Sequence, residues 1–151
     1  MSDLTNLEEI LDYAIDMEQK AVDLYTKIAE QARTEHNRKL FLSFADEERG
    51  HKTKLEMVKK GKIEIGHTEE VQDLKIVDYA NDIELSEKPS YQDILMFAMK
   101  QEKQAYRLYT DLAAKAENPD IQALFLSLAH EEANHKLRFE EEYDTEVMGE
   151  N

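Results

Sequence analysis

Two sets of acidic and imidazole side chains recur along the chain at a constant offset of 84 residues. In each set, a glutamate is followed thirty positions later by a second glutamate that begins a Glu-x-x-His motif. Carboxylates and imidazoles in this arrangement on four helices are the ligand set of dinuclear metal sites in helical bundles. The sequence therefore predicts a site for two metal ions, with the ligands Glu18, Glu48, His51, Glu102, Glu132 and His135.

The spacing of the motifs indicates that these groups are buried together. Glu48 and His51 are three residues apart, as are Glu132 and His135, so each pair projects from one face of a helix. Those faces otherwise hold Leu, Phe and Ala. Burying four ionised carboxylates without partners would cost several kcal/mol each, in a domain of about 5–15 kcal/mol total stability. Two divalent cations would balance the charge, and oxygen-rich ligation with one imidazole per ion favours Fe or Mn over structural zinc.

Less specific interpretations exist for each motif taken alone. One Glu-x-x-His on a helix is commonly a surface pair, and one Glu on an apolar face can be a salt-bridge partner, but duplication of all three ligands favours metal. Glu47 and Glu131 lie one position off the ligand face and are expected to be solvated or to support a ligand.

Tyr25 and Tyr109 follow their glutamates by seven residues. Their hydroxyls either pack in the core with local partners or bond to a ligand carboxylate across the bundle.

The repeat extends far beyond the ligands. Residues 10–56 align without a gap with residues 94–140, and 20 of the 47 pairs are identical. Hydrophobic residues recur at three- and four-residue spacing in four segments, which predicts four amphipathic helices. These run from about Thr5 to Arg33, from His36 to Lys60, from Ser90 to Ala116, and from Pro119 towards an acidic, frayed tail. Two equal hairpins predict a pseudo-twofold axis through the bundle.

Local signals mark the expected helix ends. Thr5 with Glu8, and Ser90 with Asp93, have the spacing of capping boxes. Pro119 after an asparagine suits the first position of the last helix. Gly61 suits a C-terminal stop for the second helix.

A long connector joins the two hairpins. A helix of 25 residues is roughly 37 Å long at ~1.5 Å per residue, and an extended chain covers ~3.3 Å per residue. The connector can therefore return the chain to the other end of the bundle, as in a ferritin-like crossover. We expect one all-α domain over residues 1–151, divided into repeat one (5–61), the crossover connector (62–89), repeat two (90–143) and an acidic tail (144–151).

Composition restricts the chemistry. The chain of 151 residues has a net charge of −15, which disfavours nucleic acid and anionic membranes as partners. It contains no Cys, which excludes disulfides, thiolate nucleophiles and Cys-ligated metal. Its first residues lack a basic segment, and no apolar stretch is long enough to span a membrane. A cytoplasmic location is the expectation.

The chain resembles the rubrerythrin-related branch of the ferritin-like di-iron carboxylate proteins over about residues 5–143. The resemblance rests on residues 15–25, on residues 40–52 with their Glu-Glu-x-x-His, and on the equivalent segments of the second half. It implies a ferritin-like four-helix bundle that holds two iron ions per chain, a manganese or mixed-metal pair being the alternative. It also implies the ligand roles: Glu18 and Glu102 terminal, Glu48 and Glu132 bridging, and His51 and His135 binding one ion each.

The resemblance further implies an oxidoreductase that oxidises Fe(II) with O2 or H2O2, of the ferroxidase or peroxide-scavenging type. The alternative is a non-catalytic carrier or sensor of metal. Full-length rubrerythrins add a Cys-ligated iron domain that supplies electrons, so this Cys-free chain is expected to use an external electron donor. Rubrerythrins also carry a further Glu on the third helix, where this chain has Ala105 and Tyr109. A homodimer is the assembly that the resemblance suggests.

Overall fold

Four long helices make up most of the chain. They are α1 (Leu7–Gln31), α2 (Glu35–Glu64), α3 (Tyr91–Lys115) and α4 (Pro119–Gly149). The structure is a computed structural model, and it describes residues 4–64 and 70–149.

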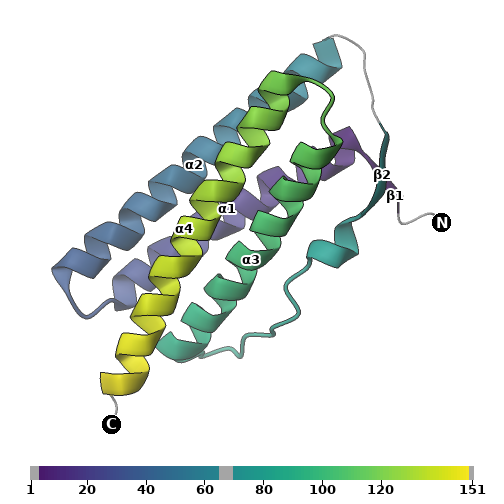
Figure 1. Ribbon diagram of the computed structural model, residues 1–151. Helices are drawn as coiled ribbons and strands as arrows, with labels where there is room; N and C mark the ends of the chain where they lie inside the picture. Colours follow the sequence, from purple (N-terminus) through teal and green to yellow (C-terminus); the bar gives the residue numbers. More distant parts are fainter. Residues whose placement is uncertain (1–3, 65–69, 150–151) are drawn as a thin grey trace.

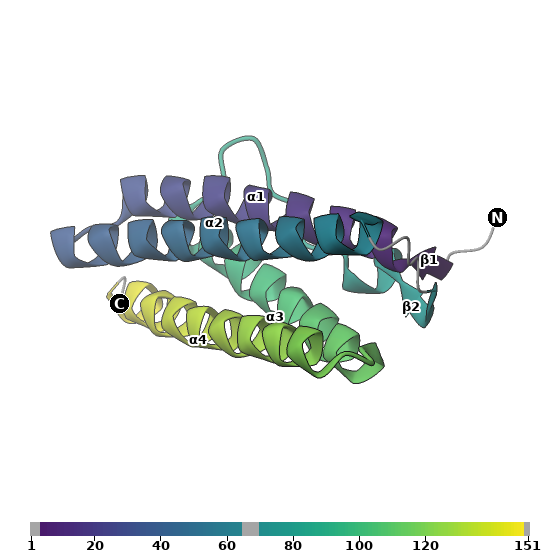
Figure 2. The same cartoon turned by 90° about the horizontal axis from the view of Figure 1, so that it is seen from above.

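The helices pair as two antiparallel hairpins. α1 packs along α2 and α3 along α4, and these are the closest helix pairings in the molecule (Figure 1). Figure 2 shows the two hairpins as two stacked layers, with α1 and α2 in one and α3 and α4 in the other. The fold is therefore an all-α, ferritin-like four-helix bundle, which confirms the predicted fold class.

A layer of polar side chains divides the hydrophobic core into two clusters. Met17 belongs to the first cluster with Leu55, and Ala21 belongs to the second with Phe139. Glu18 lies between Met17 and Ala21 on α1, and its side chain is as deeply buried as theirs. Apolar side chains therefore enclose the polar layer towards both ends of the bundle, which keeps water away from it and strengthens electrostatic interactions within it.

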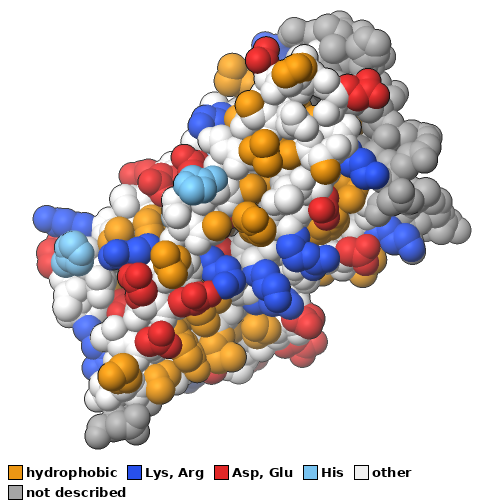
Figure 3. Space-filling view, in the orientation of Figure 1, with side chains coloured by type: hydrophobic (Ala, Val, Ile, Leu, Met, Phe, Trp, Pro, Cys, Tyr) orange, Lys and Arg blue, Asp and Glu red, His pale blue; other side chains and the backbone are white. Residues whose placement is uncertain are grey.

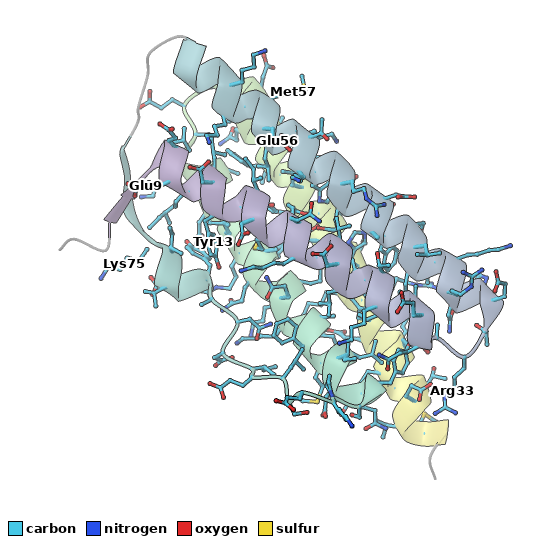
Figure 4. The ribbon with its side chains drawn as sticks, turned by 180° about the vertical axis from the view of Figure 1, so that it is seen from behind. Glu9, Tyr13, Arg33, Glu56, Met57 and Lys75 are labelled. Carbon is cyan, nitrogen blue, oxygen red and sulfur yellow. The ribbon has the colours of Figure 1, made fainter. Side chains whose placement is uncertain are left out.

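The connector runs over the side of the bundle formed by α1 and α3. It contains strand β2 (Glu70–Lys75) and the short 3-10 helix η1 (Ile76–Tyr79), and β2 pairs antiparallel with strand β1 (Leu4–Asn6). The Tyr13 hydroxyl of α1 donates to the Tyr79 carbonyl at 3.2 Å, and the Tyr79 hydroxyl donates to Asp111 of α3 at 2.6 Å. Figure 4 shows this side, where the connector passes from β2 and η1 to the start of α3.

Several helix ends lie where the sequence predicts them. Ser90 caps α3, because its side chain accepts from the Asp93 backbone N–H at 3.1 Å and the Asp93 carboxylate accepts from the Ser90 N–H at 3.3 Å. The Asn118 side chain accepts from the Asp120 N–H at 2.8 Å, and α4 begins at Pro119 as expected.

Three expected ends are wrong. The chain around Thr5 forms strand β1 rather than a helix start, because its backbone pairs with β2. Gly61 does not end α2, which continues to Glu64. The expected frayed tail is instead helical to Gly149. Residues 65–69 of the predicted connector lie outside the described residues.

The last turns of α4 are held by polar contacts with the rest of the bundle. Glu142 is buried and accepts from Asn37 Nδ2 at 2.9 Å and from the Tyr91 hydroxyl at 3.0 Å. Glu146 is buried and forms an ion pair with Arg33 at 2.8 Å. Within the described residues, each helix is too polar to cross a lipid bilayer.

Candidate metal centre

The six predicted ligands meet in the middle of the bundle. Each helix of the bundle contributes: Glu18 comes from α1, Glu102 from α3, and α2 and α4 each contribute one Glu-x-x-His pair. All six residues are at most 2% exposed. The periodicity that places them on apolar faces is the local cause, since a residue on such a face must point inward when the helices pack. The six are Glu18, Glu48, His51, Glu102, Glu132 and His135.

Their ligand atoms form two overlapping groups, each with all of its ligand atoms within 4.8 Å of one another. Both groups contain Glu48 and Glu132. Glu18 and His51 complete the first group, whereas the second is completed by Glu102 and His135. Two sites that share two carboxylates are suited to two neighbouring cations, with the shared carboxylates between them.

Each imidazole directs its Nδ1 atom at the carboxylates. His51 Nδ1 lies 3.0 Å from Glu132, 3.6 Å from Glu18 and 3.7 Å from Glu48. His135 Nδ1 lies 2.8 Å from Glu48 and 3.9 Å from Glu132. It lies 3.8 Å from Glu102. The two halves of the centre therefore have nearly the same geometry, as the repeat predicts.

The atoms that face the centre lack hydrogen bonds. Among the described residues, eight buried side-chain N and O atoms have no hydrogen-bond partner, and seven of them belong to the six predicted ligands. Buried polar atoms are almost always hydrogen-bonded in folded proteins. Orphaned oxygens and Nδ1 atoms that converge on one point therefore indicate a site built for cations, so the residues present fit a metal pair.

A carboxylate from the opposite helix holds the outer nitrogen of each imidazole. His51 Nε2 on α2 bonds to Glu131 on α4, and His135 Nε2 on α4 bonds to Glu47 on α2. Because a carboxylate can only accept, Nε2 carries the proton and Nδ1 is left as the metal-binding atom. Glu47 and Glu131 are about half exposed. The sequence left open whether they are solvated or support a ligand, and the structure shows that they contact the imidazoles.

The two tyrosines differ although they are repeat equivalents. The Tyr109 hydroxyl donates to Glu18, so it supports a predicted ligand from across the bundle. The Tyr25 hydroxyl is fully buried and has no hydrogen-bond partner among the described residues. Its ring instead packs against Phe139 and, edge-on at 6.2 Å, against His135. Tyr109 therefore makes the expected hydrogen bond to a ligand carboxylate, whereas Tyr25 packs in the core without the expected local hydroxyl partner.

Burial governs the protonation of the centre. Burial raises the pKa of Glu18, and the charge of Glu132 raises it further. The same causes hold the pKa values of Glu48 and Glu102 well above the usual range. Burial alone would lower the pKa of His51, but the nearby carboxylates of Glu132 and Glu18 raise it to about 11. For Glu132, the proximity of His51 and Glu48 outweighs burial and lowers the pKa. Without cations, the centre therefore retains protons.

Comparison with known proteins finds a matching family model and a similar solved structure. A family model described as rubrerythrin matches residues 9–143. Among solved structures, a hypothetical protein from Pyrococcus furiosus has a similar fold, with a TM-score of 0.72 and 22% sequence identity over 92% of this chain and 89% of that chain. No curated protein matches the chain. The structural match shows the shared fold and nothing more.

Proposed function

This chain belongs to the rubrerythrin family, and on that premise we propose that it binds two iron ions and oxidises Fe(II) with O2 or H2O2. The activity would be of the ferroxidase or peroxide-scavenging type. The observation that carries this proposal is the pair of overlapping ligand groups, whose inward-facing donor atoms have no hydrogen-bond partners. Charge balance supports it, since two divalent cations would offset the four carboxylates, of which burial raises the pKa of Glu18, Glu48 and Glu102.

The ligand roles follow from the two groups. Glu48 and Glu132 belong to both groups and would bridge the ions. Glu18 and Glu102 would each bind a single ion, and His51 and His135 would complete one group each through Nδ1. One imidazole with several carboxylate oxygens per ion suits Fe or Mn. A bound iron pair would supply the electrons that reduce the oxidant.

The protein itself would orient ligands, exclude water and move protons. Phe44 stacks on the His135 ring at 4.2 Å, which fixes the plane of that imidazole. Tyr109 holds Glu18 in a single orientation by its hydrogen bond. Glu47 and Glu131 extend from the imidazole Nε2 atoms to the surface, so each can pass a proton between the buried centre and solvent.

The reductant would be a separate molecule, because the chain has no Cys with which to ligate a second iron site. A cytoplasmic location and a homodimeric assembly accompany the proposal; the location rests on the sequence and the assembly on the family resemblance.

Anaerobic metal loading followed by oxidant addition tests the proposal. Metal-free protein would be titrated with Fe(II) under argon and then mixed with O2 or with H2O2, while oxidant consumption and Fe(III) absorbance are recorded. We expect two Fe(II) bound per chain and oxidant uptake in proportion to bound iron. Binding of two ions without oxidant uptake would contradict the enzymatic proposal and would favour a metal carrier or sensor. Failure to bind two ions would contradict both.

A further inference from the structure

The two halves of the metal centre differ in the side chains that pack on the imidazoles. Phe44 stacks on the His135 ring, with the ring centroids 4.2 Å apart and an interplanar angle of 29°. Tyr25 meets the same imidazole edge-on at 6.2 Å, and Phe139 packs against both of these aromatic rings. Within the described residues, no phenyl or phenol ring packs in this way on His51, and the ring 6.4 Å from it is that of His135. Aromatic side chains therefore hold the imidazole of the second group and not that of the first.

The internal repeat identifies the two positions that cause this difference. The repeat equivalent of Phe44 is Leu128, and the repeat equivalent of Phe139 is Leu55. All four side chains are buried, so each belongs to the core of its own half. A phenyl ring can stack on an imidazole, whereas a leucine presents no flat face to it. The ligands are identical in the two halves, and the side chains that surround them are not.

The terminal carboxylates differ in the same direction. The Tyr109 hydroxyl donates to Oε1 of Glu18, which leaves Oε2 as the oxygen of Glu18 that has no partner. The equivalent Tyr25 hydroxyl bonds to no side chain among the described residues, so it does not engage Glu102. Oε2 of Glu102 is buried and without a partner as well. The second group therefore combines an imidazole that is held in place with a carboxylate that no tyrosine engages.

Solvent exposure does not distinguish the two halves. All six ligands are at most 2% exposed, and their exposed fractions are nearly the same in both groups. Figure 3 shows side chains covering the middle of the face formed by α3 and α4, above the centre. The shared carboxylates Glu48 and Glu132 belong to both groups and contribute to each. Any difference in affinity must therefore come from the packing and hydrogen bonds inside the bundle.

We infer that the two groups bind cations unequally, and that the stacking of Phe44 on His135 makes the second group the tighter site. The first group, with His51, then takes the second ion, which exchanges more readily. The inference rests on the proposed function, because it takes both groups to be metal sites. A ligand that is already fixed in its binding orientation loses less conformational freedom on binding. Residues that orient metal ligands typically change metal affinity about 10–100-fold, so we expect a difference of roughly tenfold.

Mn(II) binding to two single-site variants under argon, with no oxidant present, compares the groups one at a time. His51→Ala retains the second group, and His135→Ala retains the first. Equilibrium dialysis gives the number of ions bound, and calorimetry gives the Kd of each retained ion. We expect His51→Ala to bind its ion roughly tenfold more tightly than His135→Ala does. Equal affinities or the reverse order overturn the inference and leave the proposed function standing, whereas an unaltered chain that binds no Mn(II) and no Fe(II) overturns both.

Variants of Phe44, each combined with His51→Ala, test the cause. Phe44→Leu installs the residue that the other repeat carries, and it should weaken Mn(II) binding about tenfold. It should also broaden the imidazole nitrogen couplings in pulsed EPR of the bound ion, because the ring is no longer fixed. Phe44→Tyr keeps an aromatic ring and should retain both the affinity and the couplings.

Phe125→Leu is the matched control, since Phe125 is a buried phenyl group that stacks on Tyr109 in the other half. It should leave the Kd and the nitrogen couplings of the His51→Ala protein unchanged, and circular dichroism checks that each variant is folded. The inference is overturned if Phe44→Leu alters neither quantity in a folded protein, or if Phe125→Leu alters both to the same extent.

Discussion

The Tyr109 hydroxyl on α3 donates a hydrogen bond to Glu18 on α1, 91 residues earlier in the chain. Its repeat equivalent, Tyr25, makes no such bond within the described residues. The two tyrosines are equally buried, and their hydroxyls differ in this hydrogen bond. They therefore form a matched pair in which the value of a single buried hydrogen bond can be measured.

Removal of the Tyr109 hydroxyl should destabilise the metal-free protein. Tyr109→Phe leaves a buried oxygen of Glu18 without its donor, and an unsatisfied buried group costs about 1–3 kcal/mol. Tyr25→Phe removes a hydroxyl that has no partner, so its free energy of unfolding should be unchanged or slightly higher. Urea denaturation of both variants measures the difference. Equal destabilisation by the two substitutions would contradict the asymmetry.

Loss of a shared ligand should have a greater effect than loss of a terminal one. Glu132 belongs to both ligand groups, so Glu132→Ala should abolish binding of both ions. His51 belongs to one group, so His51→Ala should retain one ion at reduced affinity. Metal analysis after equilibrium dialysis against Fe(II) or Mn(II) gives the stoichiometry. The exposed His130 provides the control, because His130→Ala should still bind two ions.

The stability of the metal-free protein should fall as the pH rises. Glu18, Glu48 and Glu102 have pKa values raised above 4.5, so their stabilising contribution is complete below that pH and is lost as each carboxyl ionises. His51 acts in the same direction between pH 6.5 and its folded pKa of about 11. Glu132, whose pKa is lowered, acts oppositely and loses its contribution only as the pH falls through its folded pKa.

Between about pH 5 and pH 8 the net effect should be a fall in the free energy of unfolding. Saturation with metal should remove or reverse this trend, because the ligands must be deprotonated to bind. Chemical denaturation at a series of pH values, with and without metal, measures both slopes. A metal-free protein that is more stable at pH 8 than at pH 5 would show that these carboxylates are ionised in the folded state.

Loss of the buried Glu142 carboxylate near the end of α4 should destabilise the protein. Glu142→Ala leaves the donors of Asn37 and Tyr91 without an acceptor, and should cost about 1–3 kcal/mol. The neighbouring Glu141 is exposed, so Glu141→Ala should change stability by no more than about 0.5 kcal/mol. Thermal denaturation of the two variants separates these outcomes, and equal effects would mean that the last turns of α4 are not held as described.

Local periodicity and the repeat predicted most of the fold and the clustering of the six candidate ligands. Helix faces follow from 3.6-residue spacing, and the constant offset identifies Glu18 and Glu102 as equivalents before any packing is known. Contacts between distant segments could not be predicted in this way. The pairing of β1 with β2 depends on the path of the connector, and the burial of Glu142 depends on donors that are remote in sequence.

The sequence only partly predicts that Glu47 on α2 and Glu131 on α4 each contact the imidazole on the other helix. Glu47 and Glu131 precede the Glu-x-x-His motifs, and their positions are compatible with either solvent or a ligand. Only the crossing of the helices shows that each one reaches the imidazole of the other half. Gly61 is a similar case, because a glycine near a helix end resembles a stop signal until the helix is seen to pass through it.

Neither hairpin holds a complete ligand group. The first group takes Glu18, Glu48 and His51 from one hairpin and Glu132 from the other, and the second group has the reverse composition. Each bound ion would therefore link the two hairpins to each other. A half-length ancestor with a single hairpin could have assembled both groups only by pairing with another copy of itself, so the duplication would have placed in one chain what two chains once shared.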